Sequence, residues 1–88
     1  MKVNTELHKE ILEVVNNQLK ANDPKETKIT LARLIGEGYS KIDAKKLIGQ
    51  CVLFEMYSMV KEEKPFNEER FTRNLKQLPK QPKGLNTL

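Results

Sequence analysis

Few side chains in this sequence could carry chemistry. There is one histidine, His8, one cysteine, Cys51, and a glutamate, Glu55, that falls among apolar residues. Nucleophilic catalysis or metal binding needs several such groups brought together. No Cys-x-x-Cys or His-x-x-x-His spacing is present to do so. We therefore predict a protein that is not an enzyme and that holds no metal and no cofactor.

Two of these residues have structural explanations. Cys51 lies on the apolar side of a predicted helix, as expected of an inert core thiol, because a reactive thiol needs exposure and a group that stabilises the thiolate. Glu55 lies in the same apolar stripe, where a carboxylate is costly unless it is paired. We expect it to lie at the rim of the stripe, where a helix end or a tyrosine hydroxyl would satisfy it. The alternative is a metal- or ligand-dependent activity, which requires His8 and Glu55 to converge.

The elements that must position these groups are helices. Apolar residues recur at helical spacing in four segments, and no strand pattern is present. We predict an all-α fold: a small four-helix bundle with a long central third helix over residues 1–78, and a flexible, disordered C-terminal tail over residues 79–88. The predicted helices cover residues 5–21, 24–35, 41–63 and 68–78.

Capping residues support these boundaries. Before the second helix, Asp23 is the predicted cap, Pro24 takes the first helical position and Glu26 closes a capping box. Ser40 and Asn67 are the predicted caps of the third and fourth helices.

Composition limits the class of protein. The 88 residues are 38% apolar and 32% charged, and a domain this small buries only about 60% of its unfolded surface, which favours interaction surfaces over deep pockets. The longest uncharged apolar run, residues 51–54, is far shorter than the roughly 20 residues of a membrane span. The first residues lack the apolar segment of a secretory signal. We expect a cytoplasmic protein with no membrane partner.

The third predicted helix carries two apolar stripes on opposite sides. Either the other helices surround it, or one stripe stays open and is buried in a homodimer. The first stripe contains Ala44, Leu47, Ile48 and Cys51. The second contains Leu53, Met56, Tyr57 and Val60.

Our leading hypothesis is a protein–protein interaction module that works through the second stripe. Methionine and tyrosine make adaptable contacts at interfaces. The partner is either another protein or a second copy of the chain. The alternative is that these residues simply pack against the fourth helix. The predicted partner-binding residues are Leu53, Met56, Tyr57, Val60 and Phe66.

A nucleic-acid-binding protein is the alternative function. The chain has a net charge of +4, and a clustered basic patch would bind phosphates in a salt-dependent way. Ala32, Gly36 and Ile42 have the spacing that holds a helix-turn-helix crossing, and the following helix would then present basic side chains to DNA. Those side chains are Lys41, Lys45 and Lys46. The basic C-terminal segment, which contains Arg70, Arg73, Lys76, Lys80 and Lys83, is the other candidate surface.

An ordered series of short segments runs through residues 8–79. It includes Asn17-Gln18-Leu19, Asn22-Asp23-Pro24, Leu31-Ala32-Arg33-Leu34, Gly38-Tyr39-Ser40, Leu47-Ile48-Gly49 and Pro65-Phe66-Asn67. In this order the segments resemble a functionally uncharacterised family of short all-helical bacterial proteins, a domain of unknown function. The resemblance implies a helical fold and a bacterial origin and brings no activity. Some relatives carry extra histidines near the start of the first helix and around the corner of residues 40–44. This chain keeps only His8, and Lys41, Lys45 and Lys46 occupy the corner, a departure that argues against a metal site here.

Overall fold

The computed structural model describes residues 5–82, and all the regular structure in that range is helical. The all-α prediction is confirmed, and each helix end lies within one residue of the expected position. The helices are α1 (Thr5–Ala21), α2 (Lys25–Gly36), α3 (Lys41–Glu62) and α4 (Glu68–Gln77).

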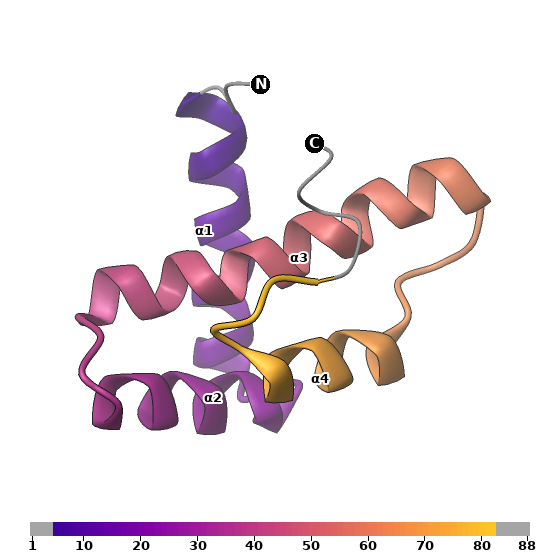
Figure 1. Ribbon diagram of the computed structural model, residues 1–88. Coiled ribbons are helices and arrows are strands. Elements are labelled where there is room, and N and C mark those ends of the chain that lie inside the picture. The colour runs from indigo at the N-terminus through magenta and orange to yellow at the C-terminus, as the bar shows by residue number, and fades with distance from the viewer. Residues whose placement is uncertain (1–4, 83–88) are drawn as a thin grey trace.

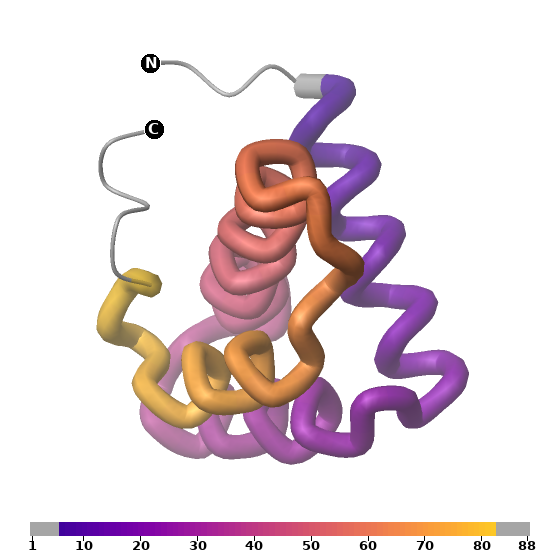
Figure 2. The backbone as a smooth tube through the Cα atoms, turned by 90° about the vertical axis from the view of Figure 1, so that its right-hand side faces the viewer, coloured from indigo at the N-terminus to yellow at the C-terminus, as the bar shows by residue number. Residues whose placement is uncertain are grey.

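The long helix α3 is central, as predicted. It packs against each of the other three helices. In Figure 1, α1 crosses behind α3, whereas α2 and α4 lie beneath it. Figure 2 looks along α3 from its C-terminal end and shows α1 on one side of it and α2 and α4 below. The described helices thus cover α3 on two sides.

The core forms where α3 faces these neighbours. Ala44, Ile48 and Cys51, three members of the first predicted stripe, are fully buried. Burying one large apolar side chain stabilises a fold by about 1.5–3 kcal/mol, so this cluster supplies much of the driving force. The other helices contribute Ile11, Val15, Leu34, Phe71 and Leu75.

One glycine allows α1 and α3 to cross closely. A Cβ atom built on Gly49 would lie 2.9 Å from Cγ2 of Ile11, a separation that real side chains almost never show. The absence of a side chain at residue 49 therefore permits the close approach of the two helices.

The predicted caps of α3 and α4 are confirmed. The Ser40 hydroxyl accepts a hydrogen bond from the backbone N–H of Asp43, and the Asn67 side chain accepts one from the backbone N–H of Arg70. Each bond satisfies an N–H group that the first helical turn leaves without a partner.

The predicted capping box of α2 is wrong. Pro24 is itself the N-cap residue, with an extended ψ of 148° and no side-chain cap bond, and α2 begins one residue later. The preceding residues are engaged in ending α1. Asn22 adopts a left-handed φ of 53°, and the Asp23 N–H donates to the Gln18 carbonyl oxygen, a pairing typical of a helix C-terminus.

The chain stays packed beyond α4 within the described range. Leu78 and Pro82 are both buried. Of the tail predicted over residues 79–88, residues 83–88 lie outside the described residues. No helix within residues 5–82 has the length and apolar character needed to cross a membrane.

Candidate functional site

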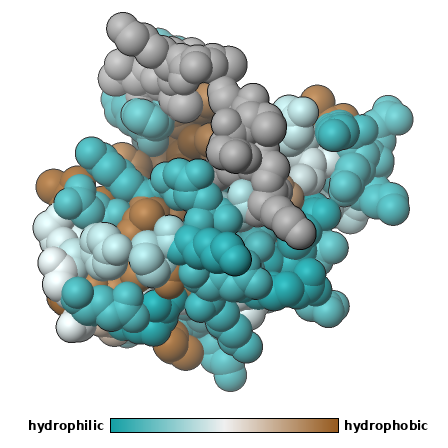
Figure 3. Space-filling model, in the orientation of Figure 1, coloured by the Kyte–Doolittle hydropathy of each residue, from teal (hydrophilic) through white to brown (hydrophobic). Residues whose placement is uncertain are grey.

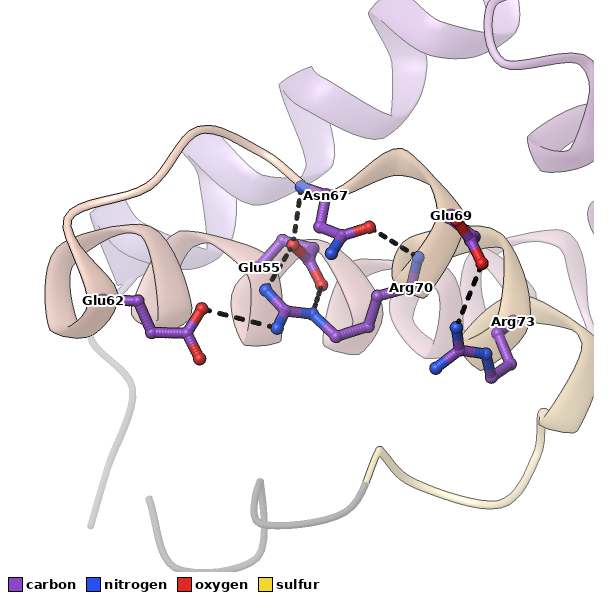
Figure 4. A network of polar contacts seen from close by, with 6 residues as sticks. All are labelled: Glu55, Glu62, Asn67, Glu69, Arg70 and Arg73. Carbon is purple, nitrogen blue, oxygen red and sulfur yellow. Dashed lines mark hydrogen bonds and ion pairs between the residues drawn. The ribbon is translucent and has the colours of Figure 1, made fainter.

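Glu55 is fully buried and fully engaged with the start of α4. Its Oε2 accepts a hydrogen bond from Arg70 Nε at 2.6 Å, and its Oε1 accepts one from Arg70 Nη2 at 3.0 Å. The backbone N–H of Asn67 donates to Oε1 at 3.0 Å. Figure 4 shows this arrangement, with the Arg70 guanidinium lying between Glu55 and Glu62. The carboxylate therefore ties α3 to α4.

This geometry separates Glu55 from His8. Helical spacing puts Glu55 on the side of α3 opposite Leu53, and His8 lines a hollow beside Leu53. The alternative activity, which required His8 and Glu55 to converge, therefore has no support in the geometry, because Arg70 and Asn67 draw the carboxylate toward α4. Among residues 5–82, no group of three or more histidine, cysteine or acidic side chains could hold a metal ion.

The expected place of Glu55 at the rim of the stripe is wrong, because the residue is fully buried. A helix end does satisfy it, as expected, but sequence reasoning missed Arg70 as its partner. The two residues lie 15 positions apart on different helices. No local spacing signals such a pair. The hydrogen bonds to Glu55 also raise the pKa of Arg70 above its ordinary value, so this cation stays charged.

Cys51 is a buried, unreactive thiol, as expected. Burial, with a smaller contribution from the negative charge of Glu55, raises the pKa of Cys51 to about 12. A reactive cysteine needs a lowered pKa and access to solvent, and Cys51 has neither.

The second predicted stripe of α3 forms an outer face, which we define as Leu53, Met56, Tyr57 and Val60. Val60 is 82% exposed and Tyr57 is 46% exposed. Leu53 and Met56 are half-buried and pack against the edge of the core. Two residues of the outer face thus pack against the core, and the other two are exposed to solvent.

Phe66 does not share this outer face. Its ring lies 5.1 Å from that of the buried Phe71, tilted by 60°, a geometry that aromatic pairs favour. Phe66 is therefore placed at the edge of the core, between α3 and α4, apart from the other four predicted partner-binding residues.

A cation lies over the outer face. The Nζ atom of Lys61 is 5.8 Å from the centre of the Tyr57 ring, within the range of a cation–π contact. The outer face therefore combines apolar surface with positive charge.

The three residues expected to hold a helix-turn-helix crossing between α2 and α3 do not pack there. Ala32, Gly36 and Ile42 are all exposed, Ile42 by 66%. The corner is held instead by the Tyr39 N–H, which donates to the Leu34 carbonyl oxygen, and by the buried Ala44.

The three corner lysines do not form one cluster. Helical spacing places Lys41 and Lys45 on one side of α3 and Lys46 roughly 100° around the axis from Lys45. Lys41 and Lys46 are exposed, and Lys45 is partly buried. In the basic C-terminal segment, Arg70 is paired with Glu55, and Arg73 lies 3.6 Å from Glu69. The corner lysines are thus spread around the helix axis, whereas Arg70, Arg73 and Lys80 line one hollow beside Phe54. Lys83 lies outside the described residues.

Helix α2 exposes two isoleucines, which lie about 120° apart around its axis. Ile29 is 61% exposed and Ile35 is also exposed, whereas Thr27 and Thr30 are buried. The helix therefore turns these two threonines inward and the two isoleucines outward. Figure 3 shows apolar surface at the lower edge of the molecule, over α2, within a largely hydrophilic face.

Comparison with known proteins finds no relative of this chain. No protein-family model, no curated protein and no solved structure matches this chain. The resemblance to a bacterial helical family therefore stays a prediction.

Proposed function

We propose that the protein is a non-enzymatic protein-interaction module that binds an acidic amphipathic helix along the outer face of α3. The observation that supports this most is the exposure of Val60 and Tyr57 above half-buried Leu53 and Met56. Exposed apolar residues gathered on one face are typical of a binding surface.

The shape of the outer face fits a helix. Its four residues follow the spacing i, i+3, i+4 and i+7, the pattern by which one amphipathic helix lies against another. Tyrosine and methionine are enriched at the centres of interfaces. A partner helix would cover Val60 and remove Tyr57 from water.

Charge favours an acidic partner over a second copy. The chain carries +4, and Lys61 lies over Tyr57. Two copies would bring like charges together, whereas an acidic helix is attracted at long range and is oriented on approach. We infer a cytoplasmic location, where a free thiol such as Cys51 stays reduced.

A designed peptide tests this proposal. It contains about 18 residues, enough to form a helix, with leucines on one face and glutamates beside them. We expect saturable binding by fluorescence anisotropy, with backbone NMR shifts centred on Tyr57 and Val60. Val60→Glu should weaken binding at least tenfold without unfolding the protein, because Val60 is largely exposed.

Ile29→Glu is the matched control, since it also places a charge at an exposed apolar site. Equal losses from the two variants, or no binding, would overturn the proposal. Sedimentation of the free protein tests the alternative that a second copy of the chain occupies the outer face. A dimer that Val60→Glu dissociates would assign the outer face to a second copy.

A further inference from the structure

A hollow of about 370 Å³ lies between α3, α4 and the segment that follows α4. In Figure 1 this segment, drawn in yellow, turns back across α3. Phe54 forms the wall on α3, and Lys80 and Gln81 form the wall beyond α4. The wall on α4 consists of Arg70, Arg73, Asn74 and Gln77.

The lining of this hollow carries three positive charges and no acidic side chain. Lys80 forms no ion pair with any residue between 5 and 82. Arg73 lies 3.6 Å from Glu69, and both side chains are largely exposed, so this pair is weak. Arg73 and Lys80 are therefore free to pair with an anion that enters the hollow.

The third cation, Arg70, is held in a fixed orientation. Two of its N–H groups donate to Glu55, and a third reaches Glu62 at 3.5 Å. A guanidinium has five N–H donors, so Arg70 keeps donors for a ligand although the two carboxylates offset its charge. Figure 4 shows Arg70 and Arg73 projecting to the same side of α4.

The remaining lining groups suit a nucleobase. The Arg70 guanidinium lies over the Phe54 ring, with Cζ 5.4 Å from the ring centre. Aromatic rings and arginine planes are the surfaces on which the bases of single strands stack. Carboxamides carry both donors and acceptors, as base edges do. The lining holds three carboxamides whose side chains bond to no residue between 5 and 82: Asn74, Gln77 and Gln81.

We propose that this hollow binds a single-stranded nucleic acid. Arg73 and Lys80 pair with its phosphates, a base lies against Phe54, and the three carboxamides contact base edges. The inference does not rest on the proposed function, because none of the outer-face residues lines the hollow.

The shape of the hollow favours a single strand over its two alternatives. The wall on α4 runs from residue 70 to residue 77, roughly 10 Å at the rise of a helix, which is longer than one phosphate group. A free phosphate would leave Phe54 and the carboxamides without a partner. A duplex keeps its bases stacked and paired inside a stiff helix, so it presents no free base to a recessed site.

A fluorescein-labelled oligo(dT) of about 12 nucleotides, which is within the usual range of site sizes, tests this proposal on the whole chain. We expect saturable binding by anisotropy, with NMR shifts centred on the side-chain amides of Asn74, Gln77 and Gln81. Two phosphate contacts predict that affinity falls about sevenfold from about 50 to about 200 mM salt, since each contact contributes about 0.7 to the logarithmic slope for single strands.

Three competitors separate the sources of negative charge. They are the same strand paired with oligo(dA), inorganic triphosphate, and a polyglutamate peptide of similar charge. Each should displace the labelled strand at least fivefold less effectively than unlabelled oligo(dT), because none of them offers a free base beside its anionic groups.

Matched variants test the assigned contacts. Arg73→Gln and Lys80→Gln should each weaken oligo(dT) binding about fivefold and lower the salt slope by about 0.7. Lys76→Gln makes the same change of charge on α4, but Lys76 lines a different hollow, so affinity should change less than twofold. Phe54→Leu should weaken oligo(dT) without affecting triphosphate. Arg70 is left intact because it neutralises the buried Glu55.

Any of three results overturns the proposal: no saturable binding at about 50 mM salt, a competitor as effective as oligo(dT), or equal losses from Lys76→Gln and from Arg73→Gln or Lys80→Gln. Arg73, Lys76 and Lys80 are exposed, so their variants should fold, and the amide spectrum checks this. If Phe54→Leu does not fold, the competitors and the three charge variants still decide the question.

Discussion

Glu55 is buried in the core because its charge is fully matched there. A buried carboxylate is tolerated only when hydrogen bonds and an opposite charge replace water. The Arg70 guanidinium provides two of these bonds and the Asn67 N–H a third. The ring of Phe54 lies 5.4 Å from the Arg70 Cζ atom and helps to shield the pair. These contacts thus explain why Glu55 is buried without giving it a further role.

We predict that Arg70→Met destabilises the protein by about 3–5 kcal/mol, because it leaves a buried charge without its partner. Urea unfolding followed by circular dichroism measures the loss. Arg73→Met is the control. It breaks an exposed pair with Glu69, and such pairs contribute only about 0–1 kcal/mol. A loss from Arg70→Met no greater than that from Arg73→Met would contradict this account of Glu55.

We predict that Cys51 lowers the free energy of unfolding at alkaline pH. Its pKa is about 12 in the folded protein and about 8.5 in an unfolded chain. Above pH 8.5 the unfolded chain releases this proton and the folded protein keeps it, so the free energy of unfolding falls as pH rises. The stability that the protonated Cys51 thiol contributes is complete below pH 8.5 and is lost between there and pH 12, by about 1.4 kcal/mol per pH unit.

The comparison variant is Cys51→Ala, in which the lysines and tyrosines titrate as they do in the wild-type protein. The difference in unfolding free energy between the two proteins should shrink steadily from pH 8.5 upward. Two curves that stay parallel over this range would refute the prediction.

At the scale of the elements, the crossing of α1 over α3 depends on residue 49. We predict that Gly49→Ala destabilises the protein by about 1–3 kcal/mol through overpacking, although alanine is the better helix former. The added Cβ meets Cγ2 of Ile11, an atom on a stiff β-branched side chain that cannot retreat. Thermal unfolding measures this effect.

Two controls localise the clash. Gly36→Ala adds a methyl group where nothing lies within 4 Å, so its cost should be close to zero. Ile11→Leu removes the branch at Cβ and should reduce the cost of Gly49→Ala. Ile11→Val keeps Cγ2 and should not. Equal costs of Gly49→Ala in both Ile11 backgrounds would mean that the helices do not meet at this contact.

At the scale of the whole molecule, Arg33 joins two helices that are distant in the sequence. Its guanidinium donates to the Leu75 and Leu78 carbonyl oxygens, both at 3.0 Å, and to Glu37. The first two bonds reach carbonyl groups at the C-terminus of α4, a helix end that attracts a cation. The Leu75 oxygen also accepts the Leu78 N–H. Arg33 thereby holds α4 against α2.

We predict that Arg33→Met lowers stability by about 1–3 kcal/mol, the cost of losing hydrogen bonds from a charged donor. Hydrogen exchange should become faster at the end of α4 before it changes in α1. Glu37→Gln, which removes only the exposed ion pair, should leave α4 protected. Uniform acceleration across all four helices would show that Arg33 has no local role.

The sequence by itself determined the helices and much of their ends. Apolar periodicity and capping are local properties, so the ranges of α1 to α4, the caps Ser40 and Asn67, and the buried positions of Ala44 and Ile48 could all be predicted. The absence of an Asp23 cap could not be predicted, because the end of α1 and the start of α2 both need the same few residues.

Only the tertiary structure decided which side chains meet. The pairing of Glu55 with Arg70, the outward turn of Ile29, and the separation of Phe66 from Val60 all depend on where one helix lies against another. That placement follows from contacts between distant residues, such as Gly49 with Ile11, and from the summed packing of the core. Periodicity along one helix marks its apolar residues but not the neighbour that will cover them.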